Sequence, residues 1–346
     1  MTTARLTGMG QAFPAIMHQD QLWDQFFSRH YAGMDAAGRL FGSVGVRTRH
    51  GVVNPCDEDV SGWGTGARME RFLVEAMPLG KDAVAAALDD AGLAPDEIGL
   101  FAVVSCTGYV SPGLDIRLAA DLGMGSDVQR LSVGHMGCYA AVPGLGAVSD
   151  YVVARGRPAV LLCLELPSLH VQPATSRLDQ VVAHAIFGDA AAAVVVEPGS
   201  GSGPGYTVVD VLARTDTSTA DHMTWDVTDM GFRMGLSPRV PAVLARHVRD
   251  VVTELLTRNG LALSDVDGWA VHPGGPRILD VVGRELRLGE QDLAISRGVL
   301  SEHGNCSSGT VLIVLDQLTR QRRSGTVVVM AFGPGLTLYT GLLVAS

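Results

Sequence analysis

The chain has 346 residues, of which 47% are hydrophobic and 18% charged, and its formal net charge is −10 at pH 7. This composition is typical of a globular chain of about two domains and excludes a disordered one. No stretch approaches the ~20 consecutive apolar residues that a membrane span requires, and the negative charge argues against broad binding to nucleic acid or anionic lipid.

The amino terminus and the cysteines favour a cytoplasmic protein. The first residues, Met1–Ala15, have neither the basic start nor the continuous apolar segment of a signal peptide. Five cysteines, an odd number without paired spacing, are typical of free thiols rather than of a disulfide framework. We therefore expect a cytoplasmic chain that contacts neither membrane nor nucleic acid.

Helical and strand patterns alternate in the first part of the chain. The predicted elements are a helix over Gly80–Leu93, a strand over Phe101–Ser105, a helix over Leu114–Leu122, a strand over Gln129–Val133, a helix that ends near Arg155, and a strand over Pro158–Leu166. The last strand is almost wholly apolar, which favours burial on both faces. This alternation predicts an α/β fold whose sheet is covered by helices.

A glycine-rich segment, Gly199–Gly205, marks the predicted junction of two units. We therefore divide the chain into a first unit over residues 1–199 and a second over residues 200–346. The second unit is predicted to contain a strand over Tyr206–Leu212, a helix over about Arg239–Arg258, a strand over Gly268–Val271 and a helix that begins near Pro276.

The two units show a weak internal repeat in the order of their predicted elements. In each, a glycine-containing turn is followed by a helix, an apolar strand, a Phe-Gly motif and a further apolar strand. The turns are Gly137-Cys138 and Gly304-Asn305, and the Phe-Gly motifs begin at Phe187 and Phe332. The order of elements matches although few residues do, so the repeat suggests a duplicated α/β unit.

Cys138 occupies a predicted strand-to-helix corner, directly after Gly137. Glycine permits a tight backbone approach there, and the start of the following helix can favour a thiolate. Pro143 is compatible with that helix only if the helix begins close to it. The corner alone leaves a nucleophilic thiol and an ordinary buried core thiol about equally open.

His272 and Asn305 are the other candidates for chemistry. His272 ends an apolar strand and is followed by a Pro-Gly-Gly-Pro segment, a position that suits a general base or a hydrogen-bond donor. Asn305 precedes a predicted helix, where it either caps the helix or donates its amide N–H to a developing oxyanion. Because Cys, His and Asn also serve some thiol proteases, the residue types alone leave the reaction open.

Further motifs occur in a fixed order along the chain. They are Gly45–His50, Met136-Gly137-Cys138, Phe187-Gly188-Asp189, Trp269–Leu279 (WAVHPGGPRIL), Ser296–Ser308 (SRGVLSEHGNCSS) and Phe332–Thr337 (FGPGLT). Together they closely resemble the type III polyketide synthases, the chalcone synthase-like family. The resemblance extends from about Gly45 to Leu343, which is nearly the whole chain.

The resemblance implies a thiolase fold, in which two similar α/β halves form a layered α-β-α-β-α core, and a homodimer. It also implies an acyltransferase that repeatedly condenses malonyl-CoA, with decarboxylation, onto an acyl-CoA starter. Neither a carrier protein nor a cofactor beyond these CoA thioester substrates is implied. The sequence also lacks metal-ligand spacings such as paired CxxC or HExxH.

The motifs also assign roles by resemblance. Cys138 would hold the starter and the growing chain as a thioester, and His272 would stabilise its thiolate as an ion pair. His272 and Asn305 would bind the malonyl thioester carbonyl and stabilise the enolate that decarboxylation forms. Phe187 matches the phenylalanine between the CoA tunnel and the cavity, with an ordinary core ring as the alternative.

Several cavity positions depart from the plant pattern, so the starter and the product cannot be transferred from chalcone synthase. Met234 stands where plant enzymes have a second phenylalanine, and Trp225 aligns with a small residue. Cys106 replaces a threonine, as in bacterial naphthalene- and resorcinol-forming relatives. Ser307 follows Asn305 in the same motif and is also expected to contact substrate.

The large Trp225 side chain favours few extensions, and hence a small pyrone or a phenolic, resorcinol-type product. A slip of the alignment in the loop around it is the alternative. Arg47 and Arg49 are expected to contact CoA phosphates, although exposed solubilising arginines are nearly as plausible at these positions.

Two other functions remain open at this point. A ketoacyl synthase III-type enzyme uses the same three residue types but takes malonyl from acyl carrier protein. The HPGG segment that begins at His272 and the scarcity of lysines, which would dock an acidic carrier, weigh against it. A catalytically silent thiolase-fold partner subunit is disfavoured because Cys138, His272 and Asn305 are all present.

Overall fold

In the computed structural model, residues 2–199, 205–321 and 325–345 are described. Among them, nine strands pair in the order β11-β12-β13-β8-β1-β7-β6-β4-β5. Their bounds are β1 Thr3–Ala12, β4 Leu100–Ser105, β5 Gln129–Gly134, β6 Ala159–Glu165, β7 Ala190–Gly199, β8 Tyr206–Thr215, β11 Gly268–Val271, β12 Thr326–Gly333 and β13 Thr337–Ala345. The short strands β2 (Ile16–His18) and β3 (Thr48–His50) pair separately, as do β9 (Met223–Thr228) and β10 (Gly231–Leu236).

The strand pairing repeats itself in the two halves of the chain. In the first half β4 pairs with β6 in parallel, β6 with β7 antiparallel and β7 with β1 antiparallel. In the second half β11, β12, β13 and β8 repeat that series of one parallel and two antiparallel pairings. The halves join where β1 pairs with β8 at Leu6 and Tyr206. The predicted fold of two similar α/β halves is confirmed.

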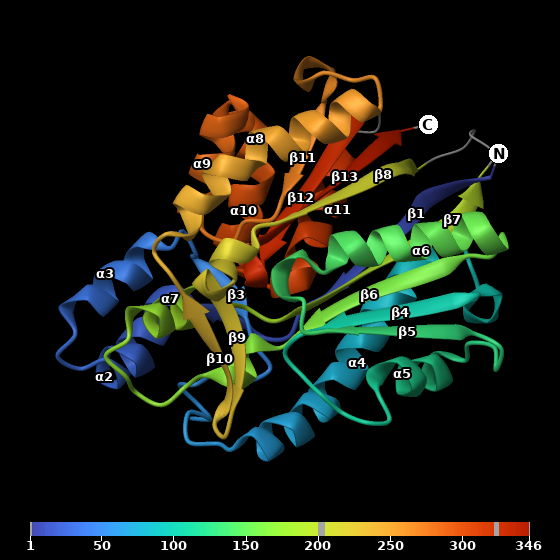
Figure 1. Cartoon of the computed structure of the whole chain (residues 1–346). Helices are drawn as coiled ribbons and strands as arrows, with labels where there is room; N and C mark the ends of the chain where they lie inside the picture. Colours follow the sequence, from blue (N-terminus) through green and yellow to red (C-terminus); the bar gives the residue numbers. More distant parts are fainter. Residues whose placement is uncertain (1, 200–204, 322–324, 346) are drawn as a thin grey trace.

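The helices form layers on both sides of these strands (Figure 1). Helices α4 and α5 cover β1, β4 and β7, and α8 covers β8 and β13 with α9 packed beside it. Helices α6 and α11 lie between the halves, since α6 contacts strands of both and α11 contacts β7 as well as β11 and β12. The helix bounds are α1 Gln19–Leu22, α2 Ser28–His30, α3 Asp35–Ser43, α4 Thr65–Ala91, α5 Leu114–Leu122, α6 Ala141–Arg155, α7 Leu178–Ile186, α8 Val240–Arg258, α9 Pro276–Leu286, α10 Ala294–His303 and α11 Thr310–Gln321.

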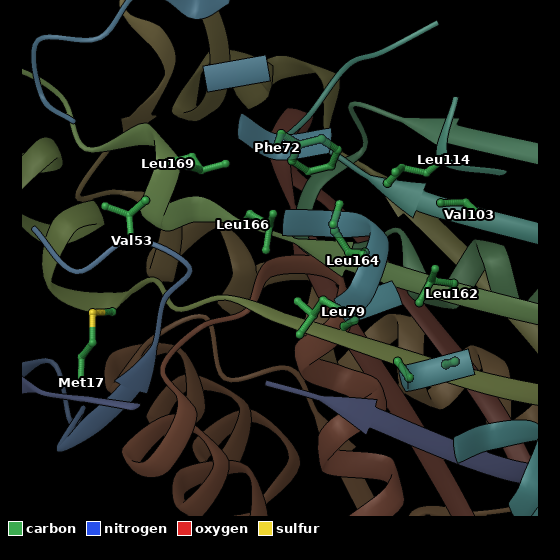
Figure 2. Close-up of a cluster of buried hydrophobic side chains, with 14 of the residues drawn as sticks. Met17, Val53, Phe72, Leu79, Val103, Leu114, Leu162, Leu164, Leu166 and Leu169 are labelled. Atoms are coloured by element: carbon green, nitrogen blue, oxygen red, sulfur yellow. The ribbon is translucent and has the colours of Figure 1, made fainter. Parts of the chain in front are cut away.

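Buried side chains follow these layers. In β12, Val327 and Val329 belong to the cluster around α6 and α11, whereas Val328 and Met330 belong to the cluster under α8 and α9. Because successive residues of a strand point to opposite faces, a strand that is buried on both faces must be apolar throughout. Figure 2 shows the third cluster, beneath α4, where Phe72 lies among leucines of β6 and its neighbours.

Two parts of the fold differ from the sequence-based expectation. Helix α4 begins at Thr65 rather than at Gly80, because Phe72 and Ala76 continue its apolar face toward the amino terminus, and Arg68 is buried on the same side through hydrogen bonds to backbone carbonyls. Strand β1 was not predicted, although it lies at the centre of the strand order. It packs closely on α4 because a Cβ at Gly10 would collide with the backbone of that helix.

The remaining predicted elements agree with the structure to within a few residues. Helix α5 has the predicted bounds, and β6 is buried along its whole length. Most of the predicted junction segment, residues 200–204, lies outside the described residues. The division into units at residue 199 therefore stays a prediction.

Candidate active site

Cys138 lies in η3 (Gly137–Tyr139), a 3-10 turn between the end of β5 and the start of α6. Gly137 has a φ of 77°, and a Cβ there would lie 2.6 Å from Pro334, so only glycine fits the turn. Helix α6 begins at Ala141, which places Pro143 in its first turn, where proline is tolerated. The local sequence therefore fixes a buried thiol at the predicted corner.

Asn305 is held by the segment that contains Phe187. Its backbone N–H donates to the Ile186 carbonyl at 2.8 Å, and the Gly188 N–H donates to the Asn305 carbonyl at 3.1 Å. The side-chain Oδ1 accepts the Ser307 N–H at 2.9 Å and lies 4.0 Å from Cys138 Sγ. Because Oδ1 already has these partners, the amide NH₂ is the end that can donate to a ligand.

His272 follows β11, and its backbone N–H donates to the Met330 carbonyl at 2.8 Å. The imidazole is fully buried, and its ring lies 5.7 Å from the Phe332 ring in a T-shaped arrangement. Neither Nδ1 nor Nε2 has a hydrogen-bond partner within the described part of the chain. Since buried polar atoms are normally satisfied, this ring is poised to bond a molecule that enters the site.

These three side chains line one cavity, which we call the outer pocket. It encloses about 380 Å³, and Phe187 and Phe332 also line it. The volume is within the range of ~300–1,000 Å³ that is typical of ligand sites. The structure thus brings together Cys138 and His272, which each follow a strand, and Asn305, which lies between α10 and α11.

Burial dominates the electrostatics of the outer pocket. It raises the pKa of Cys138 to about 12 and lowers that of His272 to about 3. Side-chain interactions with Ser307 and Asn305 oppose this rise in the pKa of Cys138. Burial alone therefore favours a neutral thiol beside a neutral imidazole, so a thiolate at neutral pH needs compensation from a neighbouring cation.

The His272→Ala variant should separate the effect of burial on the Cys138 thiol from the effect of the neighbouring His272. If His272 stabilises the thiolate, iodoacetamide should inactivate the wild type with a rate that levels off near neutral pH. In the variant burial alone acts, and the rate should rise about tenfold per pH unit from pH 7 to 9, because the thiolate fraction rises by that factor below the pKa. Rates measured by loss of free thiol test this, and identical pH profiles for the two proteins would contradict a role for His272.

A second cavity, which we call the inner pocket, lies beyond Cys138. It encloses only about 20 Å³, and its walls include all five residues predicted to contact substrate: Cys106, Phe187, Trp225, Met234 and Ser307. Trp225 and Met234 face each other across the β9–β10 hairpin. The indole Nε1 donates to the Cys106 carbonyl at 2.7 Å, so the ring lies in the cavity wall rather than elsewhere.

Glu165 is a buried neighbour of the inner pocket that sequence analysis missed. Its carboxylate accepts hydrogen bonds from Ser308 Oγ at 2.6 Å, Thr107 Oγ1 at 2.7 Å and the Cys106 N–H at 3.0 Å. Burial raises the pKa of Glu165. The sequence did offer one signal for this role, a single acidic residue at the end of the apolar strand β6. Burying such an acid without hydrogen-bond partners would cost free energy, so partners were to be expected there.

His170 was also missed, and it supports the tryptophan wall. Its Nε2 donates to the Thr107 carbonyl at 2.6 Å, and its Nδ1 accepts the Phe232 N–H at 2.9 Å. The imidazole stacks on Phe232 at 4.6 Å and meets Trp225 edge-on at 5.8 Å. This ring therefore ties the β9–β10 hairpin to the loop that follows β4.

The prediction that Arg49 contacts CoA phosphates is wrong. Its side chain is buried, and Nη1 donates to the carbonyls of His184 and Phe187 at 2.5 and 3.0 Å. The guanidinium thus holds the end of α7, where Phe187 pairs with Asn305, and cannot reach a phosphate in solvent. Arg47 is exposed and lies 3.7 Å from Glu302, so its contact with phosphate stays a prediction.

The Arg49→Ala variant should lose about 3 kcal/mol of unfolding free energy. The change leaves two buried carbonyls without a donor and removes the positive charge near buried Asp189. Urea denaturation measures the loss, with Arg47→Ala as the matched control. We expect less than about 0.5 kcal/mol from that exposed position. Equal losses of unfolding free energy in Arg49→Ala and Arg47→Ala would show that the buried contacts of Arg49 do not stabilise the fold.

Neither a metal cluster nor a membrane-spanning helix is found in residues 2–199, 205–321 and 325–345. No group of three or more His, Cys, Asp or Glu side chains in these ranges could hold a metal ion. No helix there is both long and apolar enough to cross a bilayer.

The repeated α/β halves, with a buried cysteine at a helix start beside histidine and asparagine, define an acyltransferase of the thiolase fold. Residues 2–204 match the N-terminal domain of chalcone and stilbene synthases, and residues 205–346 match their C-terminal domain. The chain belongs to the chalcone and stilbene synthase family and is a type III polyketide synthase.

Curated relatives and solved structures agree with this assignment. The chain is 37% identical over 306 residues to a 1,3,6,8-tetrahydroxynaphthalene synthase of Streptomyces peucetius, covering 86% of this chain and 80% of the relative. It is 33% identical over 314 residues to an alpha-pyrone synthesis polyketide synthase-like protein of Mycobacterium tuberculosis, covering 87% and 80%.

Two crystal structures illustrate the agreement in fold. The structure of 1,3,6,8-tetrahydroxynaphthalene synthase from Streptomyces coelicolor has a TM-score of 0.92 at 28% identity, over 99% of both chains. That of PKS-I from the brown alga Ectocarpus siliculosus has a TM-score of 0.94 at 28% identity, over 100% of this chain and 99% of the alga's.

Proposed function

We propose that Cys138 carries the starter acyl group and then the growing chain as a thioester. The single observation that carries this proposal is that Cys138, His272 and Asn305 line the same outer pocket. In the loading step the Cys138 sulfur attacks the carbonyl of an acyl-CoA, and CoA leaves as its thiol after taking up the cysteine proton through His272.

The extension step uses the two donors opposite the thiol. A malonyl thioester binds with its carbonyl oxygen between the His272 ring and the Asn305 amide. Its carboxylate then leaves as carbon dioxide, and the electron pair of the broken bond forms an enolate. The enolate carbon attacks the Cys138 thioester, a carbon–carbon bond forms, and the thiolate leaves. Donors held in a dry pocket stabilise the enolate oxygen without a metal ion.

The malonyl donor is CoA-linked in this proposal, and neither a carrier protein nor a further cofactor takes part. Incubation of the purified chain with malonyl-CoA alone, and separately with malonyl-loaded acyl carrier protein, tests this directly. Carbon dioxide release from malonyl-CoA supports the proposal. Release only from the loaded carrier would favour a ketoacyl synthase III-type enzyme, and release from neither would favour a silent thiolase-fold subunit.

The products are proposed to be small pyrones or phenolic, resorcinol-type compounds. The inner pocket, which Cys138 also lines, encloses only about 20 Å³, and the Trp225 indole forms part of its wall. In a close-packed interior a growing chain cannot share that volume. A product of few extensions therefore fits the cavity better than a long multicyclic one.

Replacing the indole should lengthen the product. Trp225→Gly removes the ring from the wall shared by the inner pocket and a further small cavity of about 40 Å³. From one starter, we expect the mass of the main product to rise by whole malonyl-derived units, as measured by liquid chromatography and mass spectrometry. Trp225→Phe, which keeps a large ring, is the matched control. An unchanged product series in a folded, active Trp225→Gly protein would mean that another wall stops the chain.

A homodimer is also proposed, with β5 at the contact. This strand ends the strand order, and along it Leu131 is 37% exposed. Ile116 on α5 and Tyr109 in the preceding loop are also exposed. An unpaired edge strand beside exposed apolar side chains is a surface that a second copy can cover. Sedimentation equilibrium tests this, and Leu131→Arg should shift a dimer toward monomer.

The chain is proposed to act in the cytoplasm. All five cysteines are free thiols in the structure, and four of them are buried. Such thiols persist in a reducing compartment. Fractionation of the producing cell with an antibody to the chain tests the location, and recovery from the medium or the envelope would contradict it.

A further inference from the structure

The rim of the outer pocket is built from the first turns of several helices. Leu178 and Asp179 of α7, Val240 of α8, and Pro276 with Arg277 of α9 all line it. Backbone N–H groups in the first turn of a helix lack partners within the helix and carry partial positive charge. In α8 these groups already donate to the Ser237 and Arg239 carbonyls or are absent at Pro241, so the first turns of α7 and α9 are the ones that make the rim attractive to an anion.

Arg277 is the only basic side chain among the residues that line this pocket, apart from the buried neutral imidazole at its base. It is exposed, and no ion pair involves it in the part of the chain that the structure describes. The one acid on the rim, Asp179, is already bound by Arg177, whose Nη2 lies 2.5 Å from its carboxylate. The free charge that the rim presents is therefore positive, in a chain whose net charge is −10.

The base of the same pocket also has hydrogen-bonding atoms without a partner. The His272 ring is fully buried there, with both nitrogens unpartnered in the described ranges. A molecule that fills the pocket thus meets neutral hydrogen-bonding groups at the reacting end and positive charge at the rim. A thioester joined through a flexible arm to a phosphorylated nucleotide has this distribution of groups.

We propose that Arg277 binds the phosphate groups of the CoA substrates and selects thioesters that carry them. This inference rests on the proposed function and deepens it, because it names the residue that recognises the nucleotide end. Arginine suits the task because its planar guanidinium donates two parallel hydrogen bonds to phosphate. Arg277 takes the place that sequence analysis wrongly gave to Arg49.

The test compares substrates with and without the nucleotide. KM and kcat are measured with malonyl-CoA and with malonyl N-acetylcysteamine, which has the thioester but no phosphate. The variant is Arg277→Ala, and the matched control is Arg284→Ala on the same helix, whose exposed side chain pairs with Glu285 at 2.9 Å. Arg277→Lys keeps the charge but loses the paired donors.

For Arg277→Ala we expect KM for malonyl-CoA to rise about tenfold, with kcat unchanged, because charged hydrogen bonds to the phosphates are lost before the reaction begins. KM for malonyl N-acetylcysteamine should not change. Arg277→Lys should lie between Arg277→Ala and wild type, and Arg284→Ala should match wild type. Equal changes for both substrates, or none for malonyl-CoA, would overturn the inference.

Calorimetric binding of CoA and of pantetheine keeps this test separate from the proposed reaction. Arg277→Ala should weaken binding of CoA about tenfold and leave that of pantetheine unchanged. If the wild type condenses malonyl-CoA but Arg277→Ala binds CoA normally, only this inference fails. If the wild type shows no condensation, the proposed function fails, and the calorimetric comparison still decides the role of Arg277.

Discussion

In the Cys138→Ala variant, no acyl adduct should form and polyketide synthesis should fall by more than about 10⁴-fold. The reason is that the thiol at the start of α6 is the only group in this account that forms a covalent bond with the starter. Intact-mass spectrometry after incubation with an acyl-CoA measures the adduct, and product analysis measures synthesis. In the wild type one acyl group per chain is expected.

The other cysteines provide the control. Cys56 is only partly buried, so Cys56→Ala should retain both the adduct and the activity. Cys106 and Cys306 are buried and do not line the outer pocket that holds Cys138, so neither is placed to attack an acyl-CoA there. An adduct that persists on either of them in Cys138→Ala would overturn the assignment.

Asn305→Ala should reduce carbon dioxide release from malonyl-CoA by about 10²–10³-fold, because removing one donor to an enolate or oxyanion typically costs that factor. Loading of the starter on Cys138 should remain, since that step does not use the amide. His272→Ala should impair both release and loading, because the thiol then also loses its partner. Labelled bicarbonate trapping measures release, and intact mass measures loading.

Asn305 also supports the local backbone, so a second variant is needed. Asn305→Asp keeps an oxygen that can accept the Ser307 N–H and removes the amide donors. It should therefore fold like the wild type, as judged by urea denaturation, and still lose release by a similar factor. Near-normal release in Asn305→Asp would mean that the asparagine acts through the backbone and not on the enolate.

The sequence could predict the reacting centre because each of its residues lies in a local motif. Cys138, His272 and Asn305 each follow or precede glycines at a strand end or a helix start, and such junctions lie at one edge of an α/β sheet. Trp225 and Met234 were also expected at the cavity, and the hairpin that pairs them places both in its wall.

The errors concern properties that depend on distant segments. Arg49 looks like a solvent arginine in the sequence, but it is buried against the carbonyls of His184 and Phe187, more than a hundred residues away. Likewise, nothing near His170 in the chain reveals that it stacks on Phe232. The roles of these two residues depend on tertiary packing, which the local sequence pattern does not reveal.

One measurement tests the central claim most directly: mass spectrometry of the products that the purified chain forms from a single acyl-CoA starter and malonyl-CoA labelled with ¹³C at every malonyl carbon. We predict products that contain the starter plus two labelled carbons for each extension, with one labelled carbon dioxide released per extension. Products without label, or free starter acid alone, would contradict repeated decarboxylative condensation by this chain.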